Sequence, residues 1–313
     1  MPLDPHLAGV LQMMAAAGRK PTWEGTAQEA RAGYLALSVG TRTTEQVVPV
    51  GSVEDAAVDG AAGPCKARIY RPGGTGPFPT VAFFHGGGFV IGDLDTHDNM
   101  CRDLCRGAQA VVVSVDYRLA PEHPFPAGID DAIAATRWVM ANAKVLGGND
   151  VVAIAGDSAG GNFSAVVAQQ LRGGPRPLAA QFLIYPGVDQ FGAGHASIEQ
   201  NAKGYFLELE TMKWFYRHYV GDWADASDPR LAPMQAANLA GLPPALIVTA
   251  EFDPLRDEGE AYARALNEAG SRAELIRGGG MIHGFFDMGR WSPAAQEIVQ
   301  AAVKRFGELL RGR

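Results

Sequence analysis

The chain has 313 residues, a formal net charge of −7, a hydrophobic share of 47% and a charged share of 19%. This composition is that of a globular protein with a sizeable core, and the length suits one large α/β domain with an elaboration or two medium domains. The chain has no basic stripe to neutralise phosphates, which argues against nucleic acid or a membrane surface as a partner. No apolar run approaches the roughly 20 residues that span a bilayer.

The beginning of the chain and its cysteines predict the compartment. Residues Met1–His6 lack the basic and apolar regions of a secretory signal, so we expect a cytoplasmic location. Cys65, Cys101 and Cys105 form an odd, sparse set that suits a reducing compartment. We expect all three to be small buried side chains rather than disulfide partners or metal ligands.

In chain order, the pattern begins with helices. Residues from about 5 to 40 hold two alanine-rich segments with helical spacing, separated by a break at Gly18–Trp23. Strands are then expected at Val47–Val50 and Lys66–Tyr70, the second ended by the turn Pro72–Gly74. We expect these two strands to form an antiparallel edge of the sheet.

After this edge, short apolar runs alternate with segments of helical length. Such alternation is typical of an α/β protein with a mostly parallel sheet and helices on both faces. The predicted strands are Thr80–Phe84, Val111–Val115, Val151–Ala155, Gln181–Tyr185, Ala245–Thr249 and Arg272–Ile276. The predicted helices lie at about 95–107, 129–146, 159–172, 258–269 and 293–311.

One long connection interrupts this alternation. Between about Gly187 and Pro233 there is no clear strand, but Met212–Tyr216 is an aromatic segment with helical character. A connection of this length inside a compact α/β domain is usually a lid or a binding insertion. We therefore divide the chain into an N-terminal part of a helical cap (1–45), a first core part (46–186), a cap insertion (187–233) and a second core part (234–313).

The sequence Gly156-Asp157-Ser158-Ala159-Gly160 lies directly after a predicted strand and directly before a predicted helix. The bare G-x-S-x-G pattern often occurs by chance, but this context is that of a nucleophile elbow. A serine on so tight a turn needs glycine two residues before and after it, because the backbones must pass closely. The helix that begins at Ala159 would direct its free N–H groups at the reacting centre. We predict that Ser158 is a catalytic nucleophile.

The sequence His85-Gly86-Gly87-Gly88 directly follows the predicted strand that ends at Phe84. Acyl transfer forms an oxyanion that needs two or three preset N–H donors, and glycines let the backbone turn its N–H groups inward. The alternative is a flexible glycine turn. We predict an oxyanion loop here, in which His85 supports the loop by hydrogen bonding rather than acting as the base.

The remaining members of a triad follow in the order Ser, Asp, His that this fold uses. Asp253 comes just after the strand Ala245–Thr249, and His283 comes after the strand Arg272–Ile276. Both would emerge at the carboxyl ends of strands, where open parallel sheets place their sites. We predict that His283 exchanges the proton of Ser158 and that Asp253 orients its imidazole.

Other acids and histidines fit these roles less well. Asp257 and Glu258 are expected to be helix N-terminal residues, and Asp157 is expected to support the elbow. No histidine besides His283 follows a late strand; the others lie in predicted cap segments, loops or helix starts.

Taken together, these motifs show that the chain resembles the bacterial hormone-sensitive-lipase-like esterases, in the subgroup whose elbow reads GDSAG. The resemblance covers nearly the whole chain, through His85–Gly92, Asp95–Asp98, Asp116–Ala127, Gly156–Asn162, Asp253–Gly259 and His283–Phe285. It implies an eight-stranded α/β-hydrolase core, a helical cap, no cofactor and a preference for short acyl esters. It also implies an oxyanion hole made by the N–H groups of Gly87, Gly88 and Ala159, with Gly86 as a further candidate.

One departure from the family concerns the segment before His283. Where family members commonly carry an aromatic residue and a single glycine, this chain has Arg277-Gly278-Gly279-Gly280. Three glycines are expected to loosen the loop that carries the base.

The leading hypothesis is a carboxylesterase for short- to medium-chain esters, with a small-molecule ester and water as partners, no metal or cofactor, and a homodimer left open. Phe89, Val90, Leu207 and Phe215 would contact the acyl chain or pack in the core, and both alternatives stay open. An amidase or lactonase with the same triad is the runner-up. A non-catalytic ligand-binding protein is disfavoured, because such proteins typically lose a triad member.

Overall fold

The fold is described from a computed structural model, over residues 1–18, 20–221 and 227–312. Residues 19, 222–226 and 313, which belong to the predicted parts 1–45, 187–233 and 234–313, lie outside the described residues. The strands are β1 (Ser52–Gly60), β2 (Gly63–Arg71), β3 (Phe78–Phe84), β4 (Val111–Asp116), β5 (Gly148–Asp157), β6 (Gln181–Ile184), β7 (Ala245–Phe252) and β8 (Ala273–Ile282). The helices are α1 (Pro5–Ala16), α2 (Ala27–Ser38), α3 (Asp98–Ala108), α4 (Ala127–Asn142), α5 (Ala159–Gln170), α6 (Ala196–Gln200), α7 (Leu209–Val220), α8 (Arg256–Glu268) and α9 (Pro293–Leu310).

Within these ranges the strands form one eight-stranded sheet in the order β1-β2-β4-β3-β5-β6-β7-β8. β1 pairs antiparallel with β2, and β2 pairs antiparallel with β4. Every pair from β4 through to β8 is parallel. The predicted mostly parallel sheet with an antiparallel edge is therefore confirmed.

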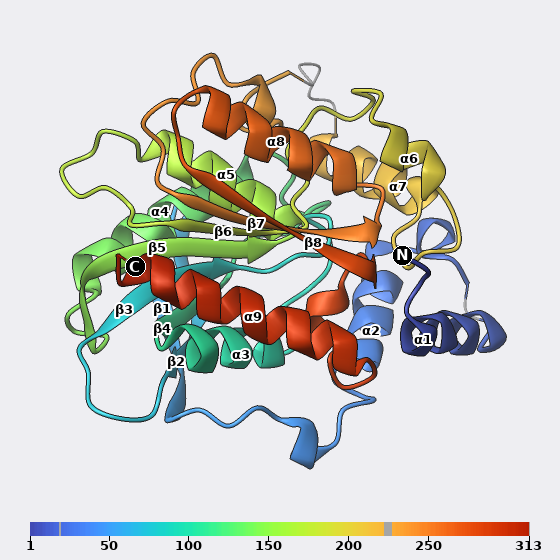
Figure 1. The fold of residues 1–313 in the computed structure, drawn as a ribbon, viewed down its shortest axis with the longest axis horizontal. Helices are drawn as coiled ribbons and strands as arrows, with labels where there is room; N and C mark the ends of the chain where they lie inside the picture. Colours follow the sequence, from blue (N-terminus) through green and yellow to red (C-terminus); the bar gives the residue numbers. More distant parts are fainter. Residues whose placement is uncertain (19, 222–226, 313) are drawn as a thin grey trace.

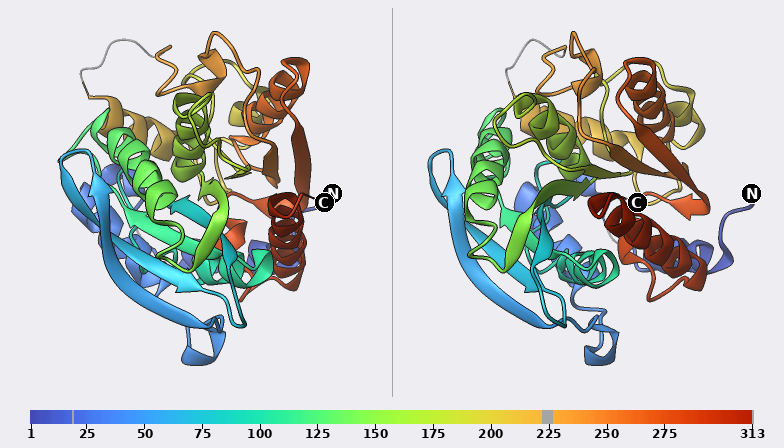
Figure 2. Two further views of the ribbon diagram at one scale, coloured as in Figure 1. Left: turned by 90° about the vertical axis from the view of Figure 1, so that its left-hand side faces the viewer. Right: turned by 60° about the vertical axis from the view of Figure 1, so that its left-hand side comes forward.

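Helices cover both faces of the sheet, with α3 and α9 on one face and α4, α5 and α8 on the other (Figure 2). Because successive side chains of a strand point to opposite faces, β3 contributes to both cores. Phe83 lies in one buried cluster with Leu104 of α3 and Phe306 of α9. Its neighbour Phe84 lies in the other cluster with Phe163 of α5. Strands buried in this way on both faces explain the continuous apolar runs of the sequence.

The strand predicted at Val47–Val50 is wrong. Sheet pairing begins only at Ser52, where β1 pairs with β2. The preceding backbone is instead satisfied by side chains of α3: the N–H of Val48 donates to Asn99 (3.0 Å), and its carbonyl accepts from Arg102 (3.2 Å). A short valine-rich run has strand propensity, but tertiary contacts decide where it pairs.

The loop predicted around Gly278–Gly280 is also wrong, because β8 continues through these glycines to Ile282. Gly278 pairs with Ala250 of β7. Gly280 has a φ of +73°, a conformation that glycine adopts without steric cost. Its N–H donates to Glu251 (2.7 Å) and its carbonyl accepts from the N–H of Asp4 (3.0 Å). The glycine run is therefore a bonded strand and not a loosened loop.

The two segments predicted as a cap lie on one side of the molecule. The arrowheads of β5 to β8 point toward the side where α1, α2, α6 and α7 lie (Figure 1). The aromatic segment Met212–Tyr216 lies within α7, and the N-terminal segments form α1 and α2, as predicted. Among the described helices, none is long and apolar enough to cross a membrane. All three cysteines are free and buried, as expected.

Candidate active site

The turn after β5 has the backbone geometry of a nucleophile elbow. Ser158 has a φ of 52° and a ψ of −115°, an arrangement that costs a non-glycine residue about 1–3 kcal/mol. The glycines at either side are sterically required: a Cβ on Gly160 would lie 2.5 Å from the carbonyl carbon of Phe84, and one on Gly156 would lie 2.7 Å from its oxygen. The N–H of Ser158 donates to the Ile184 carbonyl of β6 (2.8 Å), which holds the turn against the sheet.

The three residues predicted as a triad come together from the ends of β5, β7 and β8. His283 Nδ1 lies 2.7 Å from Asp253 Oδ2, and His283 Nε2 lies 3.0 Å from Ser158 Oγ. Because a carboxylate only accepts hydrogen bonds, Nδ1 carries the proton and Nε2 is left to accept the serine hydroxyl. Asp253 is fully buried, and His283 and Ser158 are 7% and 9% exposed.

Asp253 is held at both its side chain and its backbone. The second carboxylate oxygen accepts the N–H of Leu255 (2.9 Å), and the backbone carbonyl accepts the side-chain amide of Asn201 (3.1 Å). The competing acids Asp257 and Glu258 lie in the first turn of α8, as predicted. They accept the backbone N–H groups of Ser197 (2.8 Å) and Val188 (2.6 Å), so they bind the segment after β6 to this helix.

The glycine loop after β3 lies against the elbow. Gly87 and Gly88 have φ values of 115° and 58°, which glycine adopts readily. The N–H of Gly86 donates to the Asp157 carboxylate (2.8 Å). Gly86 is therefore removed from the candidate oxyanion donors, because its N–H is already bonded. Phe215 of α7 packs directly over Gly88, where a Cβ would lie 2.5 Å from the ring carbon Cδ1.

His85 is fully buried beneath this loop. Its Nδ1 donates to the Gly86 carbonyl (2.8 Å), its own carbonyl accepts the Tyr117 hydroxyl (2.7 Å), and its ring stacks on Tyr117 with centroids 4.4 Å apart. Burial, followed by the positive field of His97, lowers the pKa of His85 to about 4. His85 is therefore neutral at pH 7 and bonded within the loop, an environment for support rather than for proton exchange.

A cavity of about 790 Å³ adjoins the triad, and Ser158 and His283 are among the residues that line it. Phe89, Leu207 and Phe215 line it, which agrees with the first of the two alternatives left open for them. Val90 is not among its lining residues and is completely buried in the core cluster under α4, so its alternative assignment to core packing is the correct one.

Two residues at the site were not found by sequence reasoning. The ring of Tyr185 packs on that of His283, with centroids 4.6 Å apart. Its position directly after β6, at the same sheet edge as the triad, is a signal that could have found it. The amide of Asn201 reaches Asp253 from the insertion, and no local pattern indicates that contact.

Comparison with known proteins agrees with this geometry. A family model described as the α/β hydrolase fold matches residues 81–287. The chain is 47% identical over 266 residues to the carboxylic ester hydrolase LipN of Mycobacterium tuberculosis, covering 80% of this chain and 70% of that protein. It is 37% identical over 318 residues to the ethyl acetate hydrolase of Pseudomonas putida, covering 97% of this chain and 98% of that protein.

A solved structure is similar over the same extent. The esterase of Pyrobaculum calidifontis matches with a TM-score of 0.90 and 40% sequence identity, covering 97% of this chain and 99% of that chain. With its sheet order, its elbow and these relatives, the chain belongs to the α/β hydrolase family and is an enzyme of the serine ester-hydrolase class.

Proposed function

We propose that this protein is a carboxylesterase that hydrolyses short- to medium-chain acyl esters through an acyl-enzyme on Ser158. The observation that supports this most directly is the continuous chain of contacts from Ser158 Oγ to His283 Nε2 (3.0 Å) and from His283 Nδ1 to Asp253 (2.7 Å) beside a large cavity. The proposal agrees with the resemblance to hormone-sensitive-lipase-like esterases.

In the proposed reaction, Ser158 Oγ attacks the ester carbonyl carbon while His283 Nε2 takes the hydroxyl proton. The developing oxyanion accepts hydrogen bonds from the N–H groups of Gly87, Gly88 and Ala159. Asp253 stabilises the imidazolium that forms on His283. His283 then gives the proton to the leaving alcohol as the acyl-enzyme forms. A water molecule repeats the sequence, with His283 as its base, and releases the acid.

We further propose that residues 1–45 and 187–233 act together as a cap over this site. Arg31 of α2 donates to the carbonyls of Val90 (2.8 Å) and Ala120 (2.9 Å), which ties that helix to the segment after the glycine loop. Arg290 donates to the carbonyls of Leu37 and Ser38 (both 2.9 Å) at the other end of α2. A cap bonded in this way closes a pocket rather than exposing a surface to lipid droplets. A cytoplasmic location is part of the proposal and agrees with the free cysteines.

The test is an initial-rate series on p-nitrophenyl esters from acetate to palmitate, with an amide analogue alongside. Each methylene buried in the pocket adds about 0.8 kcal/mol, and overfilling costs about 1–3 kcal/mol. We expect kcat/KM to rise to a maximum between butyrate and hexanoate and to fall by laurate. A rise that continues to palmitate, or activation by an emulsion, contradicts the closed pocket. Faster turnover of the amide makes the protein an amidase.

Ser158→Ala is the control for this series, because it removes the nucleophile and keeps the Cβ. We expect no ester hydrolysis above background and an unchanged fold by circular dichroism. A fluorophosphonate should label the wild-type protein at Ser158. Labelling of another residue would rule out this nucleophile.

A further inference from the structure

A second histidine–carboxylate pair lies behind the elbow, and the proposed reaction does not use it. His97 Nε2 lies 3.4 Å from Asp157 Oδ1, at an ion-pair distance. The two residues are only 1% and 4% exposed. Asp157 directly precedes Ser158 and lines the cavity beside it, so the pair adjoins the nucleophile. A buried ionisable pair next to a reacting residue calls for a physical explanation.

Asp157 connects the two loops that the reaction needs. It belongs to the elbow through its backbone, and its Oδ1 accepts the N–H of Gly86 (2.8 Å), the first glycine of the oxyanion loop. The contact is tight, because a Cβ on Gly86 would lie 3.0 Å from Asp157 Cγ and nearer still to its oxygen. The orientation of one carboxylate therefore sets the spacing between Ser158 and the N–H groups of Gly87 and Gly88.

The contacts of His97 place a proton on Nε2, because this nitrogen faces the Asp157 carboxylate. The Thr96 hydroxyl accepts the N–H of Asp93 (2.8 Å) and lies 2.9 Å from both the Asp93 carbonyl and His97 Nδ1, so its single proton goes to one of these two. When that proton goes to the Asp93 carbonyl, His97 Nδ1 donates to the hydroxyl and the ring is an imidazolium. If Nε2 carried no proton, its lone pair would face the Asp157 carboxylate. A proton on both nitrogens makes both contacts attractive.

The groups around His97 agree with this charge. Its ring lies among those of Tyr34 (6.0 Å), Phe83 (6.4 Å) and His85 (5.3 Å), of which His85 is neutral at pH 7. Burial opposes the charge, but the fields of Asp157, Asp287 and Asp93 outweigh it and raise the pKa of His97. Burial likewise opposes ionisation of Asp157, but His97 and the Gly86 N–H outweigh it and lower the pKa of Asp157.

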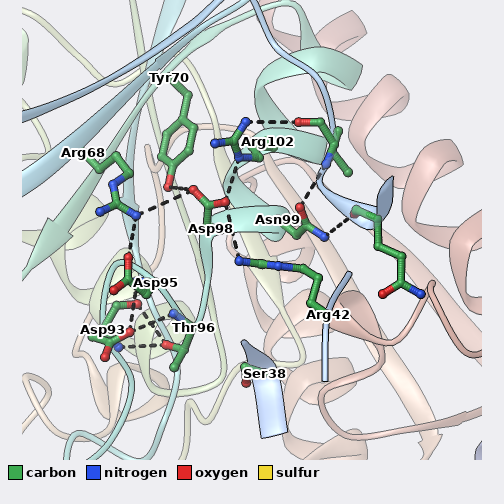
Figure 3. Close-up of polar contacts among 12 residues, drawn as sticks. Ser38, Arg42, Arg68, Tyr70, Asp93, Asp95, Thr96, Asp98, Asn99 and Arg102 are labelled. Atoms are coloured by element: carbon green, nitrogen blue, oxygen red, sulfur yellow. Dashed lines mark hydrogen bonds and ion pairs between the residues drawn. The ribbon is translucent and has the colours of Figure 1, made fainter. Parts of the chain in front are cut away.

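The residue after His97 anchors the segment that carries it. Asp98 accepts the Tyr70 hydroxyl (3.0 Å) and Arg102 Nε (2.7 Å), and guanidiniums of Arg68 and Arg42 lie 3.7 and 3.8 Å away. Figure 3 shows these side chains converging on Asp98 from separate elements. On the other side, Thr96 is bonded to Asp93, as the same view shows. His97 is therefore held between two bonded neighbours.

We propose that His97 is a positioning residue whose imidazolium fixes the Asp157 carboxylate and thereby keeps the oxyanion loop in register with Ser158. The inference rests on the proposed ester hydrolysis and deepens it. Without the imidazolium, Asp157 either turns toward other donors or takes up a proton, and in both cases its bond to Gly86 weakens. The N–H groups of Gly87 and Gly88 then lose their position relative to the developing oxyanion.

The test compares His97→Phe with His97→Gln. Phenylalanine suits the surrounding aromatic rings but gives Asp157 no donor, whereas glutamine keeps an N–H that can reach it. Because loss of one oxyanion donor costs about 10²–10³-fold in turnover, we expect His97→Phe to lower kcat on p-nitrophenyl butyrate by about 100-fold, with KM little changed. We expect His97→Gln to recover at least about 10-fold of that loss.

The matched control is Tyr262→Phe, which removes a buried hydroxyl of α8 that is bonded to Gln169 (3.0 Å); Tyr262 is not among the residues that line the cavity. It should lower the melting temperature while kcat stays within about three-fold of the wild type. This variant separates a general loss of stability from a specific loss of turnover.

The outcomes are distinguishable. An inactive wild type overturns the ester hydrolysis itself. An active wild type with His97→Phe within about three-fold of it in kcat, or with His97→Gln no better than His97→Phe, overturns only the role of His97. If His97→Phe does not unfold cooperatively, Asp157→Asn breaks the same ion pair while keeping the side-chain shape. It should lower kcat by about 10-fold at unchanged KM, and a wild-type kcat in that variant also overturns the inference.

Discussion

The contact between the oxyanion loop and α7 makes Gly88→Ala a sharp test of the site. Gly88 has a φ of 58°, and an added Cβ would come within 2.5 Å of Phe215 Cδ1, where ordinary contact begins at 3.4 Å. The ring carbon Cγ would lie nearer still, so the Phe215 ring or the loop must shift by more than about 1 Å. Either movement disturbs the backbone that is proposed to bind the oxyanion.

The cost has two parts that can be separated. A non-glycine residue in this left-handed conformation costs about 1–2 kcal/mol, and overpacking costs about 1–3 kcal/mol. We expect Gly88→Ala to lower the free energy of unfolding by about 2–5 kcal/mol. Phe215→Ala in the same chain removes the overpacking but leaves the backbone cost. The double variant should therefore be more stable than the sum of the two single variants predicts.

The assay measures urea unfolding and kcat on p-nitrophenyl butyrate for all four proteins of this double-mutant cycle. If the loop moves, kcat of Gly88→Ala should fall by about 10²–10³-fold, because a backbone donor is displaced. The double variant should regain part of that loss. Wild-type kcat in Gly88→Ala, or no coupling between Gly88 and Phe215, would refute the packing argument.

Three further predictions concern single residues. Asp253→Asn and His283→Ala should each lower kcat by about 10³–10⁴-fold, whereas His85→Ala should cost less, mainly by disturbing the loop; the reverse order in steady-state rates would exchange the roles of His85 and His283. Burial raises the pKa of Glu258 to about 8, above its usual 4.5, so the native protein keeps a proton there that the unfolded chain releases. The stabilising contribution of this proton to the free energy of unfolding is fully present below pH 4.5. It is lost as the pH rises toward 8, by up to about 1.4 kcal/mol per pH unit. Glu258→Gln keeps an acceptor for the Val188 N–H and should remove this pH-dependent loss of stability. Urea unfolding of both proteins at pH 5 and pH 7.5 measures it, and an equal change in the free energy of unfolding for the two proteins would contradict the prediction.

Two buried carboxyl groups near this site, those of Asp157 and Glu258, respond to burial in different ways. Ionised Asp157 has the His97 imidazole 3.4 Å away and accepts a backbone N–H at 2.8 Å, so its charge is compensated. Glu258 accepts a backbone N–H at 2.6 Å, but the nearby charges of Asp189 and Asp253 add to the effect of burial. The compensated carboxylate supports the loop that is proposed to bind the oxyanion, and the uncompensated one stays protonated.

The residues that the sequence alone identified are those whose requirement is local. The turn at Ser158 demands glycine at 156 and 160 because carbonyl groups pass within van der Waals distance, and such a demand is visible in five consecutive letters. The alternation of apolar runs and helical segments placed Asp253 and His283 at strand ends, which is enough to bring them to one edge of a parallel sheet.

Contacts across long separations were decided only by the tertiary structure. The valine run at 47–50 has strand propensity, yet its backbone bonds to Asn99 and Arg102 of α3 instead of joining the sheet. The glycines at 278–280 suggest a mobile loop, yet pairing with β7 and bonds from Glu251 and Asp4 make them a strand. The amide of Asn201 and the imidazole of His97 act at the site only through contacts with Asp253 and Asp157, which are more than 50 residues away in the chain. Hydrogen bonds and charge pairs of this kind depend on which surfaces pack together, and no local pattern of residue types encodes that.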